Sequence, residues 1–268
     1  MKLHVFLSVV CLLFSFTSCE KELDFKYHDI ESLTVIEGEI TATGAKVGIT
    51  LTTPMDEPLD RTLLTDASVT LTDLTAGITY NLKTDPEGFF VDPTPGIVGH
   101  NYRLSVEREG CRYEADAVMY LAVEMKELEF NWIKMPYDYV AVLQCQFFGN
   151  LSVEGECYWV RLYRNGKIYR WGEVDGRSAV DGVNTYFTMT SRKDTDVEDE
   201  EDVLFDGDVI ICTVAPVSRS MHDYLEALQN DSNGPFMFRG DKCLGYFIAT
   251  SPVSESIVFH PDEIPEYK

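Results

Sequence analysis

The segment GHNYRLSVEREGCRYEADAVM, residues 99–119, decides the predicted fold of this chain. Two runs in which apolar and polar residues alternate are separated by a turn at Glu109 and Gly110. Such a pattern is typical of a β-hairpin with one buried face. The apolar positions of the two runs are Tyr102, Leu104 and Val106, and then Tyr113, Ala115, Ala117 and Met119.

Shorter alternating runs precede this hairpin and are separated by residues that favour turns. They are LTVIEGEI (33–40), AKVGITLTT (45–53), ASVTLTDL (67–74) and ITYNLK (78–83). About seven short strands with closely spaced turns are typical of a β-sandwich of immunoglobulin-like size. The sequence therefore predicts such a sandwich over residues 33–121, although the Cys…Trp…Cys spacing of true immunoglobulin domains is missing.

The remainder of the chain, residues 122–268, contains longer strand patterns and predicts a second antiparallel β-unit. One hairpin is expected where Asn165 and Gly166 interrupt an alternating run. The strand candidates are YVAVLQCQFF (139–148), ECYWVRLYRNGKIYRW (156–171), NTYFTM (184–189), DVIICTVAPV (208–217), LGYFIAT (244–250) and ESIVFH (255–260).

One helix is predicted near residues 219–230. Its apolar residues recur with helical spacing, and Ser220 followed by Asp223 resembles a capping box. A single apolar stripe favours a helix docked on the second sheet. The stripe consists of Met221, Tyr224, Leu225 and Leu228. The predicted fold class is thus all-β (mainly β), with an N-terminal immunoglobulin-like β-sandwich, a second antiparallel β-unit and one docked helix.

The N-terminal residues indicate export. Lys2 precedes a mostly apolar run over residues 3–16, which at about fourteen residues is too short to span a bilayer. It is typical of the hydrophobic part of a signal peptide. The following FTSC (16–19) resembles a bacterial lipobox, with small residues before a cysteine whose sulfur would carry diacylglycerol. An ordinary cleaved signal with an unmodified Cys19 is the alternative.

These features predict a signal peptide over residues 1–18, lipid attachment at Cys19 and a tether over residues 19–32. Acidic residues and Lys21 follow Cys19 directly and resemble the signals that send lipoproteins to the outer face of the outer membrane. A location on the inner face is the alternative. The formal net charge of -23 disfavours binding to nucleic acids or to anionic lipids, so the predicted attachment depends on the lipid.

The cysteines leave one question open. Cys145 and Cys157 flank the stretch QFFGNLSVEGE and are candidates for a disulfide across a hairpin. The alternative is that both are small buried apolar residues. No Cys-rich or HExxH metal motif is present in the sequence.

The most acidic stretch, RKDTDVEDEEDVLFDGD (192–208), is a candidate for weak cation binding. It does not match an EF-hand, because Asp199 stands where glycine is required and Phe205 where glutamate is required. A solvated loop is therefore the favoured interpretation, with loosely bound calcium as the alternative and no other cofactor expected. The candidate ligands are Asp194, Asp196, Glu198, Asp206 and Asp208.

Aromatic residues of the second β-unit are candidates for a contact surface, although aromatic residues in strands also pack against sheets. They are Trp132, Tyr137, Tyr139, Trp159 and Trp171. The histidines are scattered, and His100 and His222 are expected to be structural. No catalytic motif of the GxSxG or P-loop type occurs, so we expect no enzymatic activity.

The order of these segments resembles the Bacteroidota outer-membrane lipoproteins grouped as domain of unknown function 4249. A shorter segment, GDKCLGYF (240–247), stands where that family often has a longer glycine-rich stretch. The resemblance implies a surface lipoprotein paired with a TonB-dependent transporter, and it implies no catalytic residues. The segments that carry it are the lipobox, VIEGEI (35–40), the 99–117 hairpin with Gly99, Tyr102 and Leu104, LFDGD (204–208), and the Tyr224–Leu225 helix followed by Gly234, Pro235 and Phe236.

The predicted function is therefore a non-catalytic interaction or binding module on the cell surface, accessory to such a transporter. One alternative is a free-standing lipoprotein that binds a glycan, a peptide or a cation. Another is a structural lipoprotein without a small ligand.

Overall fold

The structure is a computed structural model that describes residues 31–54, 57–58, 61–136, 139–150, 156–192, 203–232 and 234–265. All strands and the helix belong to one compact unit, residues 33–52 and 60–268. Of the other unit, residues 1–32 and 53–59, only a few residues are described. In the described part of the chain, no helix is both long enough and apolar enough to cross a membrane.

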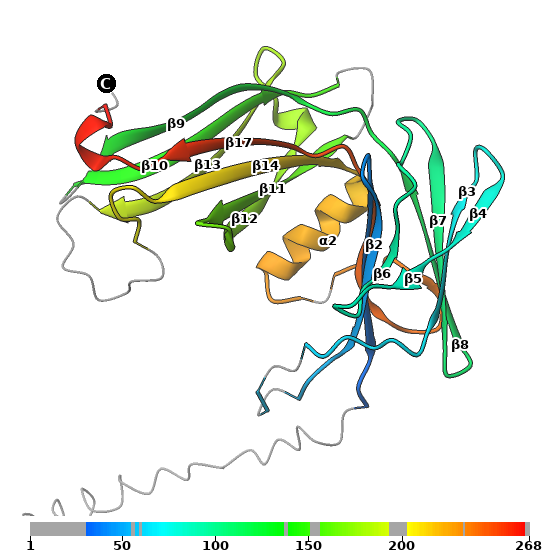
Figure 1. Ribbon diagram of the computed structural model, residues 1–268. Coiled ribbons are helices and arrows are strands. Elements are labelled where there is room, and N and C mark those ends of the chain that lie inside the picture. Colours follow the sequence, from blue (N-terminus) through cyan, green and yellow to red (C-terminus); the bar gives the residue numbers. More distant parts are fainter. Residues whose placement is uncertain are drawn as a thin grey trace, which may run out of the picture. The chain divides into compact units, whose positions relative to one another are not determined.

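Two five-stranded sheets form a first β-sandwich (Figure 1). Both sheets contribute buried side chains to one core, with Ile36, Val47 and Phe247 from one sheet and Leu71 and Leu104 from the other. The first sheet has the order β16-β1-β2-β6-β5, with β1 (Thr34–Thr41), β2 (Gly44–Leu51), β5 (Lys83–Thr84), β6 (Phe90–Asp92) and β16 (Leu244–Ala249). The second has the order β15-β8-β7-β3-β4, with β3 (Ser68–Asp73), β4 (Ile78–Asn81), β7 (Asn101–Arg108), β8 (Cys111–Val118) and β15 (Arg239–Gly240).

The hairpin predicted from residues 99–119 is confirmed as β7 and β8, which pair antiparallel. The alternating apolar residues of both strands face the core of the first sandwich. At the turn, Glu109 and Gly110 have φ angles of 52° and 84°. Positive φ at both central residues is the signature of a type I′ turn, whose twist matches that of the paired strands.

A second sandwich contains the remaining seven strands of the described residues. Its core includes Phe130, Leu143 and Phe147 from one sheet and Val160 and Ile210 from the other. One sheet has the order β13-β10-β9, with β9 (Glu124–Lys134), β10 (Tyr139–Phe148) and β13 (Val183–Arg192). The other has the order β12-β11-β14-β17, with β11 (Cys157–Arg164), β12 (Lys167–Asp175), β14 (Val209–Val217) and β17 (Val253–Val258). Two 3-10 turns complete it, η3 (Gly176–Ser178) and η4 (Pro261–Glu263).

The strand β16 corrects one assignment made from the sequence. Residues 244–250 were predicted to belong to the second β-unit, but β16 pairs in parallel with β1 of the first sandwich. Gly245 has a φ of 102°, and a side chain at this position would collide with the backbone oxygen of Ile36. The alternation of apolar residues predicts a strand but does not identify its partner, which here lies about two hundred residues away in the chain.

The predicted helix is confirmed as α2 (Arg219–Gln229). Met221, Tyr224 and Leu225 are buried as expected, whereas Leu228 is 39% exposed. The apolar side of α2 packs into a small cluster with Cys157 and Val217 of the second sandwich and Ile248 of β16, with Trp159, Trp171 and Tyr246 at its edge.

The N-cap of α2 differs from the prediction. Ser218, and not Ser220, caps the helix, and its hydroxyl accepts a hydrogen bond from the backbone N–H of Met221 at 3.2 Å. Ser218 has the extended backbone (φ -72°, ψ 161°) that an N-cap requires, whereas Ser220 is already in the first helical turn.

The disulfide considered as a possibility between Cys145 and Cys157 is not formed, and both cysteines are free and buried. Cys145 points into the core of the second sandwich, where its thiol and burial together raise the pKa of Cys212. Cys157 belongs to the cluster beneath α2, outside that core. The two side chains therefore pack in different apolar clusters. The interpretation of both cysteines as small buried apolar residues is confirmed.

Candidate functional site

The predicted aromatic surface does not exist as a single surface. Trp132 is only 3% exposed and fills the core of the second sandwich, where its indole N–H donates to the backbone oxygen of Pro261 at 3.1 Å. Tyr139 is half-buried and packs against the same core. Tyr137 lies outside the described residues. The prediction that Trp132 belongs to a contact surface is therefore wrong. Strand β9 places this side chain on the buried face of its sheet.

Trp159 and Trp171 lie elsewhere, on the outer face of the second sheet against α2. Trp159 packs edge-on against Tyr246, with ring centroids 5.5 Å apart, and the guanidinium of Arg161 lies 4.5 Å from its ring centre. Both tryptophans are half-buried, so they hold α2 in place rather than forming an exposed row.

Of the predicted cation ligands, Asp194, Asp196 and Glu198 lie outside the described residues, as does the predicted lipid site Cys19. Asp206 is exposed, and its carboxylate lies 2.7 Å from the imidazole of His260.

Asp208 is corrected from a candidate cation ligand to a structural residue. It is 8% exposed and makes an ion pair of 2.6 Å with Arg164. It also accepts hydrogen bonds of 2.7 Å from the Asn165 side chain and from the Phe205 backbone N–H. Burial alone would raise the pKa of Asp208, but these hydrogen bonds and the Arg164 charge outweigh burial and lower it. Its oxygens are therefore already occupied by protein donors.

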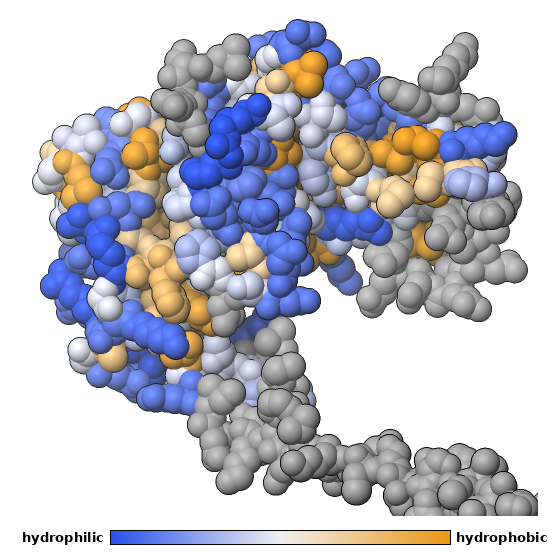
Figure 2. Space-filling view, turned by 180° about the vertical axis from the view of Figure 1, so that it is seen from behind, coloured by the Kyte–Doolittle hydropathy of each residue, from blue (hydrophilic) through white to orange (hydrophobic). Residues whose placement is uncertain are grey.

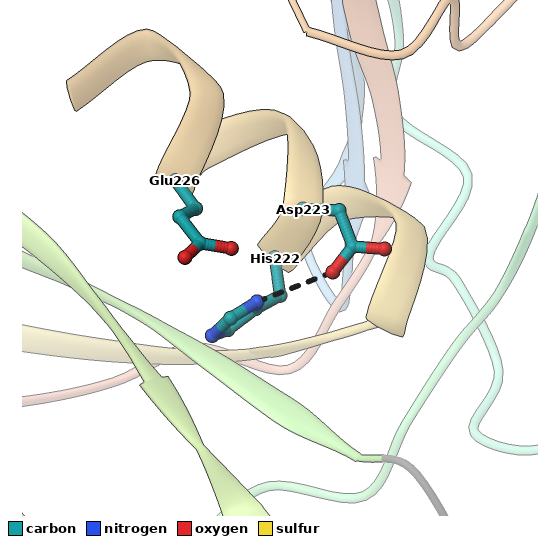
Figure 3. Close-up of side chains that lie close together, drawn as sticks. All are labelled: His222, Asp223 and Glu226. Carbon is teal, nitrogen blue, oxygen red and sulfur yellow. Dashed lines mark ion pairs between the residues drawn. The ribbon is translucent and has the colours of Figure 1, made fainter. Parts of the chain in front are cut away.

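The structure brings together three other metal-ligating side chains, on helix α2 (Figure 3). The donor atoms of His222, Asp223 and Glu226 all lie within 4.8 Å of one another. Asp223 and Glu226 are exposed, whereas the His222 side chain is only 12% exposed. The His222 Nδ1 atom is 3.5 Å from a carboxylate oxygen of Asp223, which is an electrostatic contact but too long for a good hydrogen bond.

The first turn of α2, which ends at His222, is joined to strand β12. Arg219 donates two hydrogen bonds to the Asp175 carboxylate, at 2.9 and 2.5 Å. Hydrogen bonds from Arg177 and then from Arg219 hold the pKa of Asp175 far below its usual range. A bidentate arginine–carboxylate pair of this kind defines geometry as well as adding energy. The backbone that carries His222 is therefore held in one position.

A surface cleft of about 290 Å³ lies between β12, β13 and the end of α2. Its lining combines the aromatic Trp171 and Phe187 with the polar Glu173 and Gln229. One carboxylate oxygen of Glu173 is buried without a hydrogen-bond partner among the described residues. His222, Glu226 and Gln229 follow one another at i, i+4 and i+7 and lie on one side of the helix, but only Gln229 lines the cleft.

Exposed apolar residues continue along the two strands that line the cleft. Phe187 and Met189 on β13 are 69% and 56% exposed, and Ile168 on β12 is 59% exposed. The face in Figure 2 is largely hydrophilic and shows hydrophobic side chains in separate groups. Exposed apolar residues of this size are common at contact sites.

Sequence reasoning classed His222 as structural because it found no HExxH motif. The signal that could have identified the cluster is the segment HDYLE (222–226), which places a histidine and a glutamate at i and i+4. Acidic residues on exposed helices are common, so this spacing alone is weak. The burial of one ring nitrogen distinguishes His222, and only the structure reveals it.

Comparisons with known proteins give little. No family model matches this chain, and no curated protein matches it. A solved structure titled "Biofilm associated protein - BSP domain" is similar at 13% identity with a TM-score of 0.23. The alignment covers 68% of this chain and 27% of that one, so this chain spans about a quarter of its length. A TM-score this low does not indicate a common fold.

Proposed function

We propose that this chain is an outer-membrane lipoprotein, anchored through Cys19 and facing the cell exterior, that acts as a non-catalytic interaction module accessory to a TonB-dependent transporter. The observation that carries the proposal is the FTSC stretch (16–19), which follows a short apolar run and precedes acidic residues. A lipid anchor of two or more acyl chains is sufficient for stable membrane attachment.

The described residues are compatible with a binding role. Two β-sandwiches present loops and edge strands, which are the usual contact elements of such folds. Ile168 on β12 and Phe187 and Met189 on β13 expose more than half of their surface to solvent. Phe187 also lines the cleft. These features favour a module that contacts another molecule over a purely structural lipoprotein.

Co-purification tests the accessory role. The chain is tagged at its C-terminus, outer membranes are solubilised in mild detergent, and near-stoichiometric partners are identified by mass spectrometry. We expect a TonB-dependent transporter to be recovered with the wild-type chain. A matched variant, Phe187→Ser with Met189→Ser, removes two exposed apolar side chains and should reduce that recovery without unfolding the protein. Recovery of the lipoprotein alone, also after crosslinking, would contradict the accessory role.

A free-standing ligand-binding lipoprotein remains the second candidate, because the cleft contains a buried carboxylate oxygen and aromatic side chains. Its volume of about 290 Å³ is at the lower end of the range for small-molecule sites. Glycan and peptide screens with the full-length chain would distinguish this candidate, since Glu173→Gln, which removes the carboxylate charge of the cleft without changing the side chain's shape, should weaken binding of a cleft ligand while leaving transporter recovery unchanged.

A further inference from the structure

We propose that His222, Asp223 and Glu226 form a binding site for a divalent transition-metal ion of the zinc type, with coordination positions left open. This inference goes beyond the proposed function and does not depend on membrane attachment. It rests on three observations among the described residues: a ring nitrogen without a hydrogen-bond partner, the spacing of the donor atoms, and two carboxylates that form no ion pair with a lysine or arginine.

The first observation is the state of His222. Its Nδ1 atom is buried and has no hydrogen-bond partner in the part of the chain that the structure describes. Burying a polar atom without a partner costs about 1–3 kcal/mol, and such atoms in folded proteins generally have a reason. A neutral imidazole nitrogen is the commonest protein ligand for transition metals. A bound metal would therefore supply the partner that Nδ1 lacks.

The second observation is the donor spacing. Zinc bonds to nitrogen and oxygen of 2.0–2.2 Å in a tetrahedral arrangement place neighbouring donor atoms about 3.4 Å apart. The His222 Nδ1 and Asp223 carboxylate oxygen are 3.5 Å apart. These two groups thus already stand at the distance that a shared metal ion requires.

Glu226 supplies the third donor one helical turn further on, within the 4.8 Å limit of the cluster. Its side chain is exposed and unbranched, so rotation about its own bonds brings an oxygen to the metal without moving the helix. In Figure 3 the Asp223 and Glu226 carboxylates lie on either side of the space above the His222 ring.

The third observation concerns charge. Among the described residues, neither Asp223 nor Glu226 makes an ion pair with a lysine or arginine within 4.0 Å, although the charge of Arg219 lies close enough to interact with Asp223. The nearby Arg219 is bound in a bidentate pair to Asp175. The two carboxylates of the cluster favour a divalent cation over water or a monovalent ion.

The donor set also indicates which metals fit. Imidazole suits zinc, copper, nickel and iron, whereas calcium and magnesium prefer oxygen donors alone. Three donors from one helix cover only one side of the ion, so at least one coordination position stays open, as in catalytic rather than structural zinc sites.

Isothermal titration of the full-length chain in detergent with zinc(II), after removal of bound metals with a chelator, tests the proposal. We expect one equivalent to bind to the wild-type chain. His222→Ala and Glu226→Gln should each weaken binding roughly tenfold or more. Glu226→Gln keeps the shape of an exposed side chain and therefore leaves the fold intact.

The matched control is His260→Ala, which removes a histidine that also lies beside an aspartate but outside the cluster. It should leave the affinity unchanged. Long-range proton–nitrogen NMR spectra of the His222 ring should show that zinc shifts the Nδ1 signal. Wild-type binding no tighter than that of His222→Ala, an equal loss in His260→Ala, or an unshifted Nδ1 signal would each overturn the assignment.

Discussion

Asp208 is a candidate cation ligand in the sequence but a structural residue in the folded chain. In the sequence it is the last carboxylate of an acidic stretch, whereas in the structure it lies buried beside the turn of the β11–β12 hairpin. Asn165, in the turn of that hairpin, donates to Asp208 through its side-chain nitrogen and accepts from the Val209 N–H through its oxygen. Together with Arg164, these contacts link the hairpin to strand β14.

We predict that Asp208→Ala lowers the free energy of unfolding by about 3 kcal/mol at pH 7, because it removes the buried carboxylate that pairs with Arg164 and accepts hydrogen bonds from Asn165 and the Phe205 N–H. Urea denaturation followed by tryptophan fluorescence measures this loss. Asp206→Ala is the control, since its exposed pair with His260 should contribute less than about 1 kcal/mol. Equal losses in the two variants would show that Asp208 has no structural role.

The lowered pKa of Asp208 also predicts a pH dependence. The folded state binds a proton at this carboxyl less readily than the unfolded state does. The stabilisation is therefore fully present above the unfolded pKa of about 3.9 and is lost as the pH falls through the folded pKa below it. The difference in unfolding free energy between the wild-type chain and Asp208→Asn should shrink as the pH is lowered from 6 towards 3. A constant difference over this range would contradict the assignment.

At the scale of elements, the position of α2 depends on the packing of its apolar side, on the ion pair of Arg219 and on the N-cap Ser218. Its apolar side packs on two tryptophans and on β16, Arg219 joins it to β12, and Ser218 caps its first turn. The candidate metal cluster lies in the middle of this helix, so its donor geometry depends on how well these contacts fix the first two turns.

We expect Ser218→Ala to lower the free energy of unfolding by about 1 kcal/mol, because it removes the hydrogen bond to the Met221 N–H. Ser220→Ala, two residues away, should change it by less than about 0.5 kcal/mol, since alanine is favoured within a helix. Chemical denaturation of both variants distinguishes the observed cap from the one predicted from the sequence. A larger loss for Ser220→Ala would restore the sequence-based prediction.

At this scale, the features predicted correctly from the sequence are those that depend on neighbouring residues in the chain. The hairpin of β7 and β8, the turn at Asn165 and Gly166, and the existence of α2 follow from periodicity and turn chemistry within a few residues. The N-cap was missed because Ser220, with Asp223 three positions later, fits a capping box, whereas Ser218 is followed at that spacing by Met221. Only the backbone conformation at Ser218 separates them.

The features that the sequence did not predict depend on contacts between residues far apart in the chain. The partner of β16, the inward orientation of Trp132 and the separate surroundings of Cys145 and Cys157 all depend on which sheet a strand joins. The metal-ligating cluster was missed for the same reason, because the burial of the His222 ring depends on what packs against α2. Periodicity shows which residues share a face, but it does not show what covers that face.

At the scale of the whole chain, the return of residues 239–249 to the first sandwich connects the two ends of the sequence. Phe247 and Ala249 fill the core of that sandwich, and the Thr250 hydroxyl donates to the backbone oxygen of Pro216 at 2.8 Å. The N-terminal strands therefore complete their core only after the C-terminal part of the chain has been added.

We predict that a fragment comprising residues 31–121 does not fold cooperatively, because it lacks β16 and exposes one edge of β1 and part of the core. Thermal unfolding followed by circular dichroism, with amide dispersion by NMR, measures this. Joining residues 235–250 to the fragment through a flexible linker should restore a cooperative transition. A native-like fragment without that addition would show that β16 is dispensable.

The central claim concerns attachment, and the intact mass of the mature chain purified from membranes tests it most directly. We predict a chain that begins at Cys19 and carries a diacylglycerol on its sulfur, so that its mass exceeds that of the bare polypeptide by the lipid. A mature chain with the mass of the unmodified polypeptide, or one that retains residues 1–18, would contradict the lipoprotein assignment.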